Sequence, residues 1–187
     1  MSDARLPHED LPPAQRATLT EPQEVREVET VYDRAYRRFQ KRREKAAEGP
    51  ILIKGKDQPW EQARQGRLKY FSLPTSDAPG VAESSMLVFL HEIRKHSGKH
   101  VHQGGFCIYV VEGQGYSVVD GVRYDWEKGD LLLLPIKPDG VEHQHFNRVE
   151  GQPCMWLALY WGPFFDWLGV QFEQRENSPD WKGSATP

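Results

Sequence analysis

Apolar residues occur in the second half of the chain as short runs separated by turn residues. The runs span 106–111, 116–119, 122–126, 131–134 and 155–161, with a further run at 86–93 ahead of them. Asp120-Gly121 separates two of these runs by two residues, which is a strong signal for a tight β-hairpin. Regularly spaced short strands with turns between them predict an all-β fold, an antiparallel barrel or jelly roll.

The first quarter of the chain has a different period. Apolar side chains recur at helical spacing from Val25 to Phe39, and Thr20 is a suitable N-cap with Gln23 three residues later. We therefore expect a helix over 21–49, preceded by a flexible Pro-rich arm over 1–20. A barrel domain is expected over 50–176, with further strands at 51–53 and 68–73, and a C-terminal tail over 177–187.

Two pairs of histidines stand within the strand region, His100 with His102 and His143 with His145. Side chains at i and i+2 of a strand point to the same face, so each pair shares a face. If both strands line one interior, three or four imidazoles converge there. Imidazole is a ligand for Fe, Zn, Cu and Ni, so the pattern predicts a metal site.

The spacing of these residues resembles the two motifs of the cupin family over about residues 85–162. His100, His102 and Gly113 match the first motif, and the second is matched by Gly129, Pro135, Gly140, His143 and Asn147. The glutamate of the first motif falls on Phe106. The strand sequence at 110–121 and the missing glutamate resemble the gentisate and salicylate 1,2-dioxygenase branch. That resemblance implies a cupin jelly roll in which His100, His102 and His143 are the metal ligands and His145 is a catalytic residue near the substrate.

Three neutral imidazoles would leave a divalent metal with its full charge in a dry barrel, which favours an anionic chelating ligand. We therefore expect an Fe(II)-dependent dioxygenase that cleaves a hydroxylated aromatic acid or phenol with O₂. One alternative is a β-diketone-type dioxygenase, or an isomerase or lyase that uses Mn, Ni, Zn or Cu on an enolisable substrate. Another is a cupin that binds a small ligand without catalysis.

The surroundings of the site are less constrained by the sequence. His145 is a fourth metal ligand, a proton-transferring residue beside the substrate, or an inward polar residue bonded to the backbone. Candidate pocket walls are aromatic or apolar strand residues, namely Phe106, Ile108, Tyr109, Trp156 and Tyr160. His91 and His96 have no spaced partner and are expected on the surface or in loops. A gentisate-type pocket needs a cation for the carboxylate, yet the corresponding strand offers Ile108.

Net charge and cysteine content limit the classes of partner and the cellular compartment that we expect. The chain has 187 residues, a net charge of −3 and two cysteines. This charge gives no reason to expect nucleic acid or a membrane as a partner, and two cysteines suit a reducing cytoplasm. We expect a cytoplasmic homodimer or higher homo-oligomer.

Overall fold

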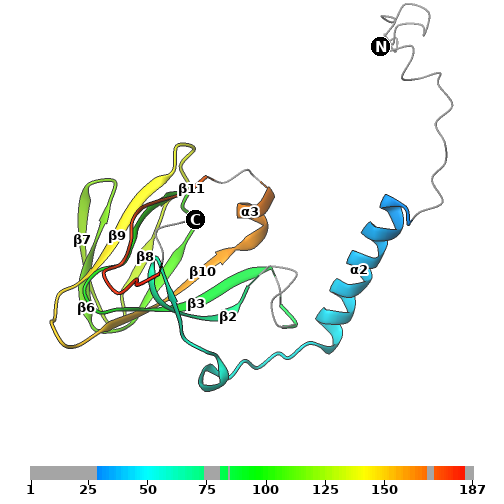
Figure 1. Ribbon diagram of the computed structural model, residues 1–187, viewed down its shortest axis with the longest axis horizontal. Coiled ribbons are helices and arrows are strands. Elements are labelled where there is room, and N and C mark those ends of the chain that lie inside the picture. Colours follow the sequence, from blue (N-terminus) through cyan, green and yellow to red (C-terminus); the bar gives the residue numbers. More distant parts are fainter. Residues whose placement is uncertain (1–28, 74–80, 84, 168–170, 184–187) are drawn as a thin grey trace, which may run out of the picture. The chain divides into compact units, whose positions relative to one another are not determined.

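The computed structural model describes residues 29–73, 81–83, 85–167 and 171–183. The strands in these ranges form two antiparallel sheets (Figure 1). One sheet has the order β1-β2-β3-β10-β5-β8. Its strands are β1 (Glu61–Ala63), β2 (Gly66–Ser72), β3 (Met86–Ile93), β10 (Cys154–Trp161), β5 (Cys107–Glu112) and β8 (Leu131–Leu133).

The second sheet has the order β11-β4-β9-β6-β7. Its strands are β11 (Phe172–Glu176), β4 (Lys99–His102), β9 (Val141–Asn147), β6 (Gln114–Val119) and β7 (Val122–Glu127). This arrangement confirms the predicted all-β jelly roll. Asp120 and Gly121, with φ of 49° and 80°, turn β6 into β7, as the sequence predicted for a hairpin of this type.

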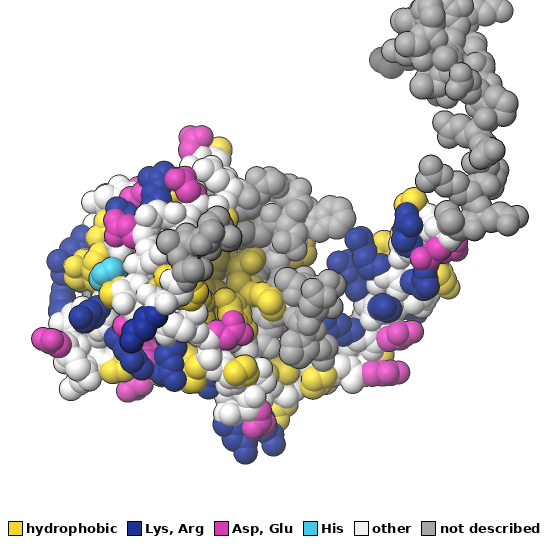
Figure 2. All heavy atoms as spheres, in the orientation of Figure 1, with side chains coloured by type: hydrophobic (Ala, Val, Ile, Leu, Met, Phe, Trp, Pro, Cys, Tyr) yellow, Lys and Arg dark blue, Asp and Glu magenta, His cyan; other side chains and the backbone are white. Residues whose placement is uncertain are grey.

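The hydrophobic core lies between the sheets, because alternate residues of each strand point inward. Its buried members include Ile93, Ile108, Val110, Val119, Trp126, Leu134, Val141, Cys154, Trp156 and Ala158. On the face shown in Figure 2, hydrophobic side chains gather near the middle of the barrel, and basic and acidic side chains are intermixed around them.

Two helices and a 3₁₀ turn complete the described elements: α2 (Val31–Glu48), η2 (Gly55–Asp57) and α3 (Gly162–Trp167). Of the helix expected over 21–49, residues 31–48 are helical and residues 29 and 30 are not, whereas residues 21–28 lie outside the described residues. Thr30 is its cap: the Asp33 amide donates to Thr30 Oγ1 at 3.1 Å, and Thr30 Oγ1 donates back to the Asp33 carboxylate. The predicted cap Thr20 and the arm over 1–20 lie outside the described residues.

Leu131 and Leu133, in the apolar run at 131–134, are more than half exposed, because β8 lies at the edge of its sheet. Two other expectations need correction. Residues 51–53 are not a strand. The expected tail does not begin at 177: the Ser178 side chain is buried, and its amide donates to the Arg64 carbonyl at 2.7 Å. None of the described helices combines the length and the apolar composition needed to cross a bilayer.

Candidate metal centre

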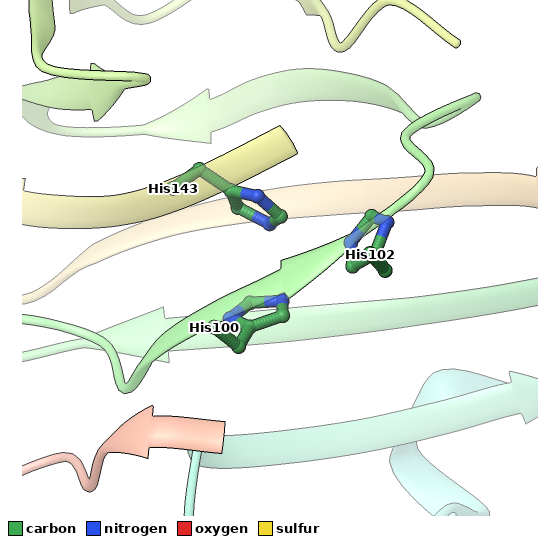
Figure 3. Close-up of side chains that lie close together, drawn as sticks. All are labelled: His100, His102 and His143. Atoms are coloured by element: carbon green, nitrogen blue, oxygen red, sulfur yellow. The ribbon is translucent and has the colours of Figure 1, made fainter. Parts of the chain in front are cut away.

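Three histidines from two neighbouring strands converge inside the barrel. His100 and His102 lie on β4 and His143 lies on β9, with His100 directly opposite His143 in the strand register. One ring nitrogen from each residue lies within 4.8 Å of the others, and the rings face one another (Figure 3). His102 and His143 are buried and His100 is half-buried. The strand alternation predicted from the sequence is thus the geometry that builds the cluster.

Hydrogen bonds behind the rings set their tautomers. Nδ1 of His143 lies 3.0 Å from the Val141 carbonyl, and Nδ1 of His100 lies 3.4 Å from the Gly98 carbonyl. A carbonyl only accepts, so each Nδ1 carries the ring hydrogen and Nε2 keeps a free lone pair, as a metal ligand requires. His102 differs, because its Nδ1 accepts from the Gly104 amide at 3.0 Å. Binding a metal through its Nε2 requires His102 to give up that hydrogen bond.

Burial keeps the cluster uncharged. Desolvation lowers the pKa of His100 well below 6.5, and the neighbouring His143 and His102 lower it further. Desolvation likewise lowers the pKa of His102 to about 3 and that of His143 to about 4. Neutral imidazole is the form that binds a metal, so none of the three rings has to lose a positive charge before it binds one at neutral pH. A trio of neutral imidazole donors therefore fits a divalent transition metal.

A carboxylate is absent from the cluster among the described residues. The ring of Phe106, at the position where the motif resemblance puts a glutamate, lies 4.7 Å from the ring of His102 between centroids. Phe106 also packs on Tyr160 with a centroid separation of 4.5 Å. An aromatic wall therefore stands where a charged ligand would neutralise part of the metal's charge.

The cluster opens into a cavity of about 170 Å³ between the sheets. Phe106, Ile108, Trp156 and Tyr160 line it, as expected. Tyr109 does not: it is 44% exposed, because it alternates with the inward Ile108 on β5. The other lining residues are Gln65, Leu68, Tyr70, Leu87, Phe89, His91, His100, His102, His143, His145 and Phe172. None of the described residues in this lining is a lysine, arginine, aspartate or glutamate.

His145 stands beside the cluster and is not one of its members. It is two residues from His143 on β9, its ring is buried, and its centroid lies 5.5 Å from that of His143. Nδ1 lies 2.6 Å from Ser117 Oγ on β6. Burial lowers the pKa of His145 well below 6.5, and the nearby His143 and His91 add to this. The ring is therefore neutral.

His91 was expected on the surface or in a loop, and this was wrong. It lies on β3, is 2% exposed and lines the cavity, with its ring 4.6 Å from that of Trp156 between centroids. The signal was available in the alternation, since His91 shares its strand face with Leu87, Phe89 and Ile93. His96 is half-buried, and its main chain forms a bridge with Phe146. Gln65 and Phe172 reach the cavity through chain pairings that no local pattern marks.

Comparisons with known proteins give one family match. Residues 88–160 match the family model described as a cupin domain. No curated protein matches the chain.

Solved structures give distant likenesses. A salicylate 1,2-dioxygenase from Pseudoaminobacter salicylatoxidans in complex with gentisate is 23% identical, with a TM-score of 0.49. The match covers 81% of this chain and 39% of that one. Streptomyces Pac13 with uridine, a nucleoside dehydratase, is 13% identical with a TM-score of 0.48, over 69% of this chain and 93% of that one. These likenesses concern the barrel and assign no activity. The chain thus carries a match to the cupin domain over residues 88–160, and these residues lie within the two-sheet barrel.

Proposed function

We propose that the protein is a mononuclear Fe(II)-dependent dioxygenase that acts with O₂ on a small chelating aromatic or enolic substrate. The observation that carries this proposal is the trio of neutral imidazoles, without a carboxylate, at one side of an aromatic cavity. His100, His102 and His143 would hold the metal. Bound Fe(II) would supply the one-electron chemistry that O₂ requires and that amino-acid side chains lack.

The charge balance favours an anionic ligand. Three neutral rings offset none of the metal's two positive charges, and a buried net charge is costly unless it is paired. A ligand with two adjacent oxygens, at least one of them ionised, would neutralise the site and occupy two positions. Catecholates, ortho-hydroxybenzoates and enolised β-diketones share this arrangement.

The cavity wall narrows the substrate class further. Its described lining contains no arginine or lysine that could hold a second anionic group away from the metal. The negative charge of the substrate should therefore reside on its chelating oxygens. A benzoate fits this requirement when its carboxylate is itself one of the chelating arms. The rings of Phe106 and Tyr160 offer apolar contact to the flat remainder of such a molecule.

Oxygen uptake tests the proposal directly. Metal-free protein would be reloaded with Fe(II) under anaerobic conditions and mixed with O₂ and catechol, salicylate, gentisate or acetylacetone. We expect O₂ consumption in proportion to product with at least one of the four. His143→Ala should lose both the bound metal and the uptake, because two imidazoles hold a divalent ion poorly. His96→Ala, a histidine outside the cluster, is the matched control and should keep both.

Other outcomes decide among the alternatives. Conversion of an enolisable substrate without O₂ consumption would overturn the dioxygenase and support a metal-dependent isomerase or lyase. Tight binding of a chelating ligand without any conversion would support a non-catalytic cupin.

A further inference from the structure

A buried chain of hydrogen bonds leads from β7 through β6 to His145. Trp126 Nε1 donates to Ser117 Oγ at 2.9 Å, and Ser117 Oγ lies 2.6 Å from His145 Nδ1. Ser117 has no exposed surface, and the side chains of Trp126 and His145 are 7% and 2% exposed. The two hydrogen bonds that join these residues are therefore buried.

Counting hydrogens gives the direction of each bond. An indole N–H can only donate, so Trp126 occupies one lone pair of Ser117 Oγ. The hydroxyl then has one hydrogen of its own to place, and His145 Nδ1 is the other partner of Oγ among the described residues. If Nδ1 donated instead, the hydroxyl hydrogen would be buried without an acceptor, which is strongly unfavourable. Ser117 therefore donates to Nδ1.

The tautomer of His145 follows from this direction. A neutral imidazole whose Nδ1 accepts a hydrogen bond carries its hydrogen on Nε2. His100 and His143 have the opposite tautomer, with Nδ1 against a carbonyl and Nε2 free to bind a metal. His145 is thus set up as a hydrogen-bond donor, which distinguishes it from His143, the candidate ligand two residues away.

The His145 ring lies where its Nε2–H can donate to a ligand in the cavity. His145 lines the cavity beside His143, and its Nε2 takes part in none of the hydrogen bonds found among the described residues. We infer that Ser117 and Trp126 are positioning residues, which hold His145 as an N–H donor toward an anionic oxygen of the ligand bound at the three-histidine cluster. The tautomer stands on the geometry alone, and the oxygen partner rests on the proposed function.

The strand register and a glycine on β6 bring Ser117, His145 and Trp126 together. Ser117 lies directly opposite His145 across β6 and β9, and Gly115 lies opposite Trp126 across β6 and β7. A Cβ at Gly115 would overlap the Trp126 ring, so the absence of a side chain gives the indole its place. A second buried serine, Ser97, accepts from the His145 amide at 2.9 Å without being bonded to the ring.

Histidine-selective ¹⁵N NMR on metal-free protein tests the tautomer. The His145 signal, identified by its loss in His145→Gln, should show hydrogen on Nε2 and none on Nδ1. Ser117→Ala removes the donor and should bring out an Nδ1–H population, whereas Ser117→Thr keeps the hydroxyl and should restore the original signal. Ser97→Ala is the matched control and should leave the tautomer unchanged. An Nδ1–H signal in the wild type would overturn the inference.

The variant Trp126→Phe tests the same hydrogen-bond network if the Ser117 variants do not fold. It keeps the Ser117 hydroxyl but frees the lone pair that fixes its direction, so we expect a mixed His145 tautomer. An unmixed Nε2–H signal in this variant would show that Trp126 has no positioning role.

Ligand binding tests the second half of the inference. Catechol would be titrated into Co(II)-loaded protein under anaerobic conditions and followed by the visible bands of the metal. Loss of a hydrogen bond to a charged oxygen should weaken binding about tenfold in Ser117→Ala, with unchanged metal content, and Ser117→Thr should recover it. Unchanged affinity in Ser117→Ala would remove the ligand-facing role. Absence of O₂ uptake with the expected tautomer would refute the proposed function alone.

Discussion

Single side chains set the chemistry of this cavity through burial more than through charge. His91, His100, His102, His143 and His145 lie in or beside one low-dielectric space, and desolvation is the largest cause of the lowered pKa of each. These residues are consequently neutral over the physiological range. Protonation of any one of them opposes folding, so the same burial that prepares the ligands makes the barrel sensitive to acid.

His91 provides a test of this acid sensitivity away from the metal cluster. Burial lowers its pKa to about 3, and the Gln65 backbone offsets this in part. In the unfolded chain His91 takes up its proton near 6.5, so below that pH the unfolded state binds more protons and the free energy of unfolding falls. The slope per histidine is about 1.4 kcal/mol per pH unit.

The variant His91→Gln should therefore show a shallower loss of stability between pH 6.5 and about 4 than the wild type. Urea unfolding of both proteins in EDTA, at several pH values in that window, measures the difference. Gln keeps a neutral polar side chain against Trp156, and circular dichroism verifies the fold. Parallel slopes would contradict the assignment of His91 as a buried neutral base.

Because Phe106 is uncharged, it leaves the three-histidine cluster without a carboxylate at this position. Phe106→Glu would bring a carboxylate beside His102, which should raise divalent metal affinity roughly tenfold or more and weaken catechol binding by a similar factor, because the charge is already neutralised. Competition with a coloured chelator measures the first effect, and ligand titration the second. The neutral variant Phe106→Gln is the control for shape. Equal catechol affinity in both variants would show that charge does not govern ligand choice.

At the scale of elements, alternation along strands and the spacing of the family motifs together predicted the three-histidine cluster. The i, i+2 pairs placed His100 and His102 on one face, and cupin spacing identified His143 as the partner on a distant strand. The predictions for Tyr109 and His91 were wrong, because Tyr109 points to the face opposite the buried Ile108 and His91 shares its face with the buried Ile93. The pairing of β11 with β4 could not be predicted, since a polar strand at the sheet edge has no hydrophobic period of its own.

Gly115 on β6 is the element-scale position most sensitive to substitution. A Cβ there would overlap both the Trp126 ring and the Phe146 carbonyl, so Gly115→Val should lower the free energy of unfolding by roughly 2 kcal/mol or more. Denaturant melts provide the measurement. Gln114→Val introduces the same side chain at the neighbouring exposed position and should change stability little. Comparable losses in both variants would point to a general strand effect instead.

At the scale of the whole molecule, a metal would join two strands that hydrogen bonds already pair. A ligand that binds the folded state alone adds about 4 kcal/mol of stability at a thousandfold excess over its dissociation constant. Adding Zn(II) to EDTA-treated protein should therefore raise Tm by several degrees. The rise should be absent in His143→Ala and present in His96→Ala. A rise of equal size in His143→Ala would place the metal elsewhere on the chain.

One wall of the centre comes from the far end of the chain. Phe172 on β11 stacks parallel to His102 at 6.3 Å and lies 5.5 Å from His100 between ring centroids, and β11 pairs with β4 along its length. All three candidate ligands precede this strand in the sequence. We expect a barrel in which β11 has not yet paired with β4 to leave His100 and His102 open on this side, so that a metal ion can reach them before the strand covers them.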